Sequence, residues 1–300
     1  MKIENSVPHP VALDGSPSRV KTERPAENNS KPSDKSTRQA GSKRIRSWFA
    51  QVGIQSGYGP GLPESTEQQF QQRRLLNEQR KINNLQRILD KALEFCLPDE
   101  TQTDIDPDWF FSFINMAEQI HSKPMQELWG KIFAVEQSHP GTFSLNTLRI
   151  LQQITHKEAL QFRHAIQLAS RQKGDPSPKI LLGFYRKQSI WSFFSANNEQ
   201  QLNLAQFGLS YPDLLSLIDL GLIHHSEIET GELPPGENFE WRVGGQVLQL
   251  RPKSRGLTLV YFKFTTTGSE LSKLVNHHKH DHYLFALKRC LSVAFELDQT

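Results

Sequence analysis

Apolar residues in the middle of the chain recur every three or four positions, the spacing of amphipathic helices. In residues 106–162 this spacing, with short polar connections, predicts four helices. The second of them carries an apolar stripe made of Met125, Leu128, Trp129, Ile132 and Phe133. Because such a stripe needs a partner surface, the run predicts a compact helical unit over residues 99–172.

The helices of this unit begin with residues that can satisfy the N–H groups of a first turn. Asp106 is a good N-cap, and Pro107 follows where its missing N–H costs nothing. Ser144 is the expected N-cap of the third helix. Thr155, with Glu158 three residues later, predicts a capping box for the fourth.

A long polar helix is predicted before this unit, over residues 64–98. Its apolar positions form two columns with seven-residue spacing, at Leu75, Ile82 and Leu89 and at Leu85 and Ala92. Seven-residue spacing is the repeat of paired helices. The pattern favours a helix packed on the next domain or a short contact between two copies, which would make a homodimer.

Residues 173–300 mix strand and helix patterns. The apolar segments 179–185 and 189–195 follow the proline-containing break at 174–178 and are expected to be two short strands, or one strand and an irregular apolar segment. Ser210 and Asp213 predict a capping box for a helix that ends at Gly221.

The end of the chain continues this mixture. Residues 222–228 can form a strand, and 238–243 with 246–251 predict a hairpin around Gly244 and Gly245. The remaining expected elements are a strand over 257–264, a helix whose start has a capping box of Thr267 and Glu270, and a last helix from Asp281. The segment VAFEL after that helix can be extended.

This order of elements is similar to the second half of a winged-helix domain. The expected fold class is therefore α+β and mostly helical: a helical N-terminal unit followed by a winged-helix-like domain with a small antiparallel sheet. The helix that would enter a DNA groove contains Asp213 and Asp219 and no Lys or Arg. It lacks the side chains that contact guanine and phosphate, so we expect this half to pack on or bind protein.

Residues 1–63 form a basic tail. They hold ten Lys and Arg against five Asp and Glu, whereas the whole chain has a net charge of +3. Few large apolar side chains precede Ile45, so residues 1–42 are expected to be disordered. The segment 43–52 is amphipathic, with Ile45, Trp48, Phe49 and Val52 on one face.

Three interpretations of this segment stay open. Trp48 and Phe49 can dock on the folded part of the chain. Alternatively, Lys43, Arg44, Arg46 and Trp48 can bind nucleic acid or an anionic membrane surface, where basic charge meets phosphate and an aromatic ring stacks or inserts.

Candidate chemistry is sparse elsewhere. His277, His278, His280 and His282 lie close together, with His278 and His282 four residues apart, but Cys290 is the only other obvious ligand nearby. We expect a polar turn there with Asp281 as N-cap, no metal and no cofactor. Glu118, Glu127 and Glu136 are expected on solvated helix faces, and Trp109 and Trp129 as core anchors.

The chain has two cysteines, no apolar leader and no apolar run of membrane-spanning length. These features predict a cytoplasmic protein with reduced thiols. No phosphate-binding loop, dinucleotide fingerprint or hydrolase signature is present, so no catalytic residue is predicted.

Several segments resemble a family of bacterial proteins described only as a domain of unknown function. They are Asp108-Trp109, the block MQELWGKI, Glu136, the segment from Pro140 to Leu148, and the later LIDLGLI and FTTTGSEL. The similarity spans about residues 78–275 and implies no activity. The leading hypothesis is a non-enzymatic protein-interaction or regulatory protein. The alternatives are a nucleic-acid-binding protein acting through the tail, and an enzyme or metal-binding protein using the histidine cluster.

Overall fold

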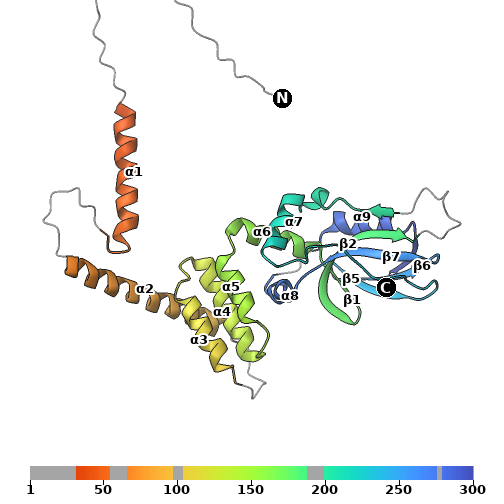
Figure 1. Ribbon diagram of the computed structural model, residues 1–300, viewed down its shortest axis with the longest axis horizontal. Coiled ribbons are helices and arrows are strands. Elements are labelled where there is room, and N and C mark those ends of the chain that lie inside the picture. Colours follow the sequence, from red (N-terminus) through yellow and green to blue (C-terminus); the bar gives the residue numbers. More distant parts are fainter. Residues whose placement is uncertain (1–31, 55–65, 97–103, 188–198, 276–278, 300) are drawn as a thin grey trace, which may run out of the picture. The chain divides into compact units, whose positions relative to one another are not determined.

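The structure is a computed structural model that describes residues 32–54, 66–96, 104–187, 199–275 and 279–299. It divides into two compact units, Met1–Arg73 and Arg74–Thr300 (Figure 1). The predicted strand at 189–195 and two of the clustered histidines, His277 and His278, lie outside the described residues.

The first unit contains α1 (Pro32–Ala50) and the beginning of α2 (Thr66–Glu94). Helix α1 starts well before the predicted amphipathic segment, so the expected disorder is wrong for residues 32–42. The polar residues of this stretch, KSTRQAGSK, continue the helix that Ile45, Trp48 and Phe49 make amphipathic. Both aromatic side chains are exposed, so their predicted docking on the folded part is not confirmed.

The four helices predicted over 106–162 are confirmed, and they follow α2 in the second unit, where we call them the helical half. They are α3 (Pro107–Ala117), α4 (Lys123–Ser138), α5 (Leu145–Gln153) and α6 (His156–Gln167). The predicted caps explain their starts. Asp106 accepts from the backbone N of Asp108 at 2.7 Å, and Thr155 and Glu158 form the reciprocal capping box.

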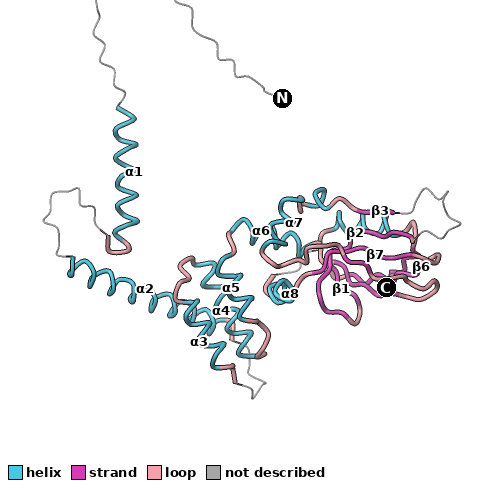
Figure 2. Tube along the Cα trace, viewed as in Figure 1, coloured by secondary structure: helices cyan, strands magenta, loops and turns pink. Residues whose placement is uncertain are grey.

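The remainder of the unit, here called the sheet half, is one antiparallel sheet with short helices, drawn in magenta and cyan in Figure 2. The strands are β1 (Ser170–Gln172), β2 (Asp175–Arg186), β3 (Glu199–Gln201), β4 (Ile228–Glu229), β5 (Phe239–Val243), β6 (Gln246–Pro252), β7 (Leu257–Lys263) and β8 (Phe295–Gln299). Their order is β4-β7-β2-β1-β5-β6-β8, and β3 pairs with β2. The helical elements are a 3₁₀ turn (Leu204–Phe207), α7 (Tyr211–Asp219), α8 (Thr266–Ser272) and α9 (Asp281–Leu291).

The α+β class is confirmed, and the eight-stranded sheet is larger than the small one predicted. The hairpin around Gly244 and Gly245 is confirmed, because both glycines have positive φ, as a two-residue turn of this kind requires. The strand predicted over 222–228 is wrong except at its end, since β4 begins only at Ile228. The winged-helix likeness is not confirmed.

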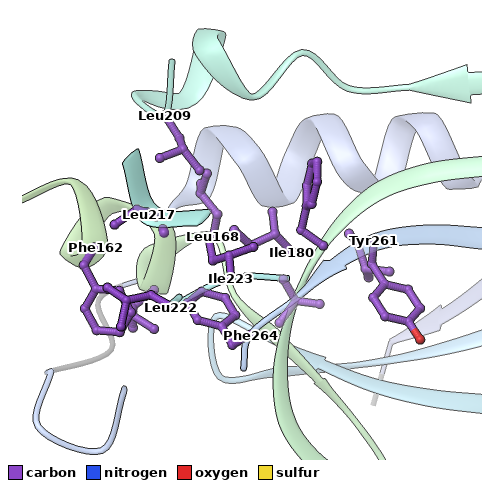
Figure 3. Close-up of a cluster of buried hydrophobic side chains, with 14 of the residues drawn as sticks. Phe162, Leu168, Ile180, Leu209, Leu217, Leu222, Ile223, Tyr261 and Phe264 are labelled. Atoms are coloured by element: carbon purple, nitrogen blue, oxygen red, sulfur yellow. The ribbon is translucent and has the colours of Figure 1, made fainter. Parts of the chain in front are cut away.

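The core of the sheet half joins residues from distant parts of the sequence (Figure 3). Phe162 of α6 packs edge to face on Phe264, which follows β7, with ring centroids 6.0 Å apart. Gly268 allows the start of α8 to approach this region, because a Cβ there would lie 2.0 Å from the carbonyl oxygen of Leu222.

Glu270 connects α8 to the helical half. Its carboxylate accepts from the backbone N of Ser144 at 2.7 Å, from the Ser144 hydroxyl at 3.0 Å and from the Thr147 hydroxyl at 2.5 Å. The predicted box of Thr267 with Glu270 is therefore wrong, and Thr265 caps α8 instead. A carboxylate at the N-terminus of α5 is also favoured by the helix dipole.

Replacing Glu270 by Ala is expected to lower the free energy of unfolding by about 2–4 kcal/mol, because it leaves three donors at the start of α5 without their charged acceptor. Urea unfolding followed by circular dichroism measures the change. Glu237→Ala, at an exposed position, is the matched control and should change stability by less than about 0.5 kcal/mol. Equal stability of the two variants would refute this role of Glu270.

Candidate functional site

The buried amide of Asn84 holds helix α2 against the helical half. Asn84 Nδ2 donates to the carbonyl oxygen of Glu118 at 2.8 Å, and Asn84 Oδ1 accepts from Gln126 Nε2 at 3.0 Å. Gln126 Nε2 also donates to the carbonyl oxygen of Ile120 at 2.9 Å. Because backbone carbonyls can only accept, the orientations of both side-chain amides are fixed.

His121 completes this network beside a polar pocket. Its Nδ1 lies 3.0 Å from Asn84 Nδ2, and since that nitrogen is a donor, Nδ1 must accept and the ring is neutral. Burial, together with the charge of Arg80, lowers the pKa of His121. The pocket, about 240 Å³, is also lined by Lys81 and Glu118, whose charged groups lie 3.5 Å apart.

Close packing at Gly130 reinforces the contact between α2 and α4. A Cβ at Gly130 would lie 2.6 Å from Lys91 Cβ, 2.9 Å from the backbone N of Ala92 and 3.0 Å from the carbonyl oxygen of Ile88. The absence of a side chain therefore lets the two helices touch through their backbones. Asn84, Ile88 and Ala92 are all buried on this inner face of α2.

The outer face of α2 is apolar and exposed. Leu75 is 72% exposed, Ile82 50% and Leu89 54%, and Leu93 beside this column is 65% exposed. At 100° per residue, the apolar positions of α2 occupy a wide arc of the helix surface, with Ile88 near one edge and Leu75 near the other. The helical half covers only the part of this arc around Ile88. We call Leu75, Ile82, Leu89 and Leu93 the outer column.

The two apolar columns predicted for this helix thus have different environments. Leu85 and Ala92 pack on the helical half, whereas Leu75, Ile82 and Leu89 do not. The sequence spacing does not distinguish the columns. The sequence analysis did not identify Asn84, the buried residue that fixes the rotation of α2.

The tail residues proposed to bind nucleic acid or an anionic surface lie together on α1. Lys43, Arg44, Arg46 and Trp48 are all exposed, and Trp48 is 70% exposed. They belong to the first unit, and the outer column of α2 belongs to the second.

The structure assigns local roles to the described part of the histidine cluster. His280, rather than the predicted Asp281, caps α9 through Nδ1, which accepts from the backbone N of Tyr283 at 3.1 Å. His282 is exposed, and burial raises the pKa of the Cys290 thiol to about 11. Within the described ranges, no group of three or more His, Cys, Asp or Glu could hold a metal ion.

The prediction that Glu136 lies on a solvated helix face is wrong, because this residue is only 2% exposed. Its two carboxylate oxygens accept from the backbone N of Gly141 at 2.6 Å and of Phe143 at 2.9 Å. Burial raises the pKa of Glu136, and the nearby Glu270 adds to the effect, while the backbone donors oppose it. The Trp109 indole donates to the carbonyl oxygen of the same Phe143 at 2.7 Å. Glu136 and Trp109 therefore both stabilise the loop before α5.

The predicted core anchors are confirmed, because Trp109 and Trp129 are both buried. Glu118 and Glu127 are partly exposed, and the Glu127 carboxylate pairs with Lys131 at 2.8 Å. None of the described helices has the length and apolar character needed to cross a bilayer.

Comparison with models of protein families gives a match. The model of the family described as Protein of unknown function (DUF2806) matches residues 68–288. The match covers most of the chain, and the chain belongs to this family, which confirms the resemblance stated from the sequence. No curated protein and no solved structure matches.

Replacing Asn84 by Ala is expected to lower the free energy of unfolding by about 1–3 kcal/mol, because Gln126 Nε2 loses one of its two acceptors and two further groups lose their donor. Asn83→Ala is the control, since Asn83 bonds only to the neighbouring Gln79 in an exposed pair. Denaturant unfolding of both variants tests the prediction. A loss as large in Asn83→Ala as in Asn84→Ala would contradict it.

Proposed function

We propose that this member of the DUF2806 family is a non-enzymatic protein-interaction protein that associates with a second copy of itself through α2. The description of the family assigns no activity. The observation that carries the proposal is the outer column of α2, which is exposed although the helix is anchored along its neighbouring face. Large apolar side chains exposed along one face of a helix mark candidate interaction sites.

A second copy of the chain fits the spacing of the outer column. Leu75, Ile82 and Leu89 are seven residues apart, the repeat with which two helices pair along a shared seam. In a parallel pair like positions face each other. In an antiparallel pair centred on Ile82, Leu75 of one copy meets Leu89 of the other.

The length of α2 supports the same partner. The helix has 29 residues, which corresponds to about four heptads and is enough for a helical pair. The column is narrow, with Glu78 and Gln79 between its apolar members. We therefore expect weak, concentration-dependent association and a regulatory rather than a permanent contact.

The sheet half takes no part in nucleic-acid binding in this proposal. Asp213 in the first turn of α7 bonds to Ser210 and Gln161, and α7 carries no Lys or Arg. A winged-helix-like role in DNA binding is thus disfavoured by charge. We also propose a cytoplasmic location, supported by Cys96 and Cys290, which form no disulfide with each other.

Sedimentation equilibrium of the full chain over a wide concentration range tests the self-association. We expect a monomer–dimer equilibrium for the natural sequence. Ile82→Glu should raise its dissociation constant at least about tenfold, because a charge would enter the apolar seam.

Asn83→Glu is the matched control, since it adds the same charge one residue away, outside the outer column. It should leave the equilibrium nearly unchanged. A chain that stays monomeric at every concentration, or a dimer that Ile82→Glu and Asn83→Glu affect equally, would overturn the proposal.

A further inference from the structure

We propose that α1 binds the surface of anionic phospholipid membranes through its C-terminal end. The residues concerned are Ile45, Trp48, Phe49 and Ile54, here named the α1 apolar end, and the flanking Arg44 and Arg46. This interaction is separate from self-association through α2, because α1 lies in the first compact unit and the outer column in the second.

The side chains of the α1 apolar end are exposed on the last turns of the helix and just after it. A Schellman motif ends the helix: Gly53 has a φ of 71°, its N–H donates to the carbonyl oxygen of Ala50 at 3.0 Å, and the Ile54 N–H donates to that of Phe49 at 3.0 Å. This turn brings Ile54 back towards the last helical turn. Ile45 is 60% exposed and Phe49 53%, so the described residues do not cover the cluster.

The cations are placed at both borders of this apolar face. At 100° per residue, Ile45, Trp48 and Phe49 lie within about 100° of one another, and Arg44 and Arg46 lie about 100° to either side of Ile45. Both guanidinium-bearing residues are exposed. A helix with this arrangement can lie in a membrane interface with its apolar face inserted and its arginines among lipid phosphates.

A lipid surface fits these residues better than nucleic acid. Bases stack on Trp and Phe, but a nucleic acid offers no apolar volume for the side chains of Ile45 and Ile54. A bilayer accepts aliphatic and aromatic groups together. A flat anionic surface also meets both arginines at once, and each cation near such a surface adds to the attraction.

Flotation of the full chain with large vesicles tests the proposal. We expect recovery with vesicles of phosphatidylcholine and phosphatidylglycerol and much less with phosphatidylcholine alone. The double variant Arg44→Gln/Arg46→Gln should weaken binding about 30-fold, and Trp48→Ala at least about tenfold, whereas Trp48→Phe should retain it.

The control is Arg73→Gln/Arg74→Gln, which removes the same charge from exposed positions of α2 and should float like the natural sequence. Equal recovery with both vesicle types, or binding that Trp48→Ala does not weaken, would overturn the proposal. So would binding to a single-stranded oligonucleotide, lost on Arg44→Gln/Arg46→Gln, in a chain that does not float with vesicles.

Discussion

The rotation of α2 about its own axis is the constraint on which the proposed function depends. Asn84 sets it, because its buried amide is held between Gln126 Nε2 and the carbonyl oxygen of Glu118. A different rotation would leave these groups without partners in a low-dielectric interior, which is costly. With Asn84 facing inward, Ile82 and Leu89 are turned away from the helical half.

Two carboxylates stabilise the other end of the helical half in a related way. Glu136 binds the backbone of the loop before α5, and Glu270 binds the first residues of α5 itself. Both lie in segments that carry the resemblance to the family, as does Trp109, which also bonds to this loop. These residues therefore have structural roles in the helical half.

Local signals in the sequence predicted much of the fold. The cap at Asp106, the box at Thr155 and Glu158, and the turn at Gly244 and Gly245 depend on residues a few positions apart, so they could be recognised directly. The full sheet could not be predicted. Several of its strands, such as β1 and β4, are two or three residues long and are specified by their partners rather than by their own pattern.

Long-range polar contacts were the other part beyond reach. Glu270 looked like half of a local capping box, but its partners lie more than 120 residues earlier. The sequence predicted Glu136 on the surface, because the residues next to it in the chain do not indicate that it is buried. The candidate site was half predictable: heptad spacing identified both columns of α2, whereas only tertiary contacts show which column stays exposed.

Cysteine cross-linking at the outer column tests the central claim most directly. In a Cys96→Ser background, Ile82→Cys should form a disulfide between two copies under mild oxidation, since Ile82 faces its own counterpart both in a parallel pair and in an antiparallel pair centred on it. Asn83→Cys, one residue away, should not. Efficient cross-linking at both positions, or at neither, would contradict pairing of two chains through this face of α2.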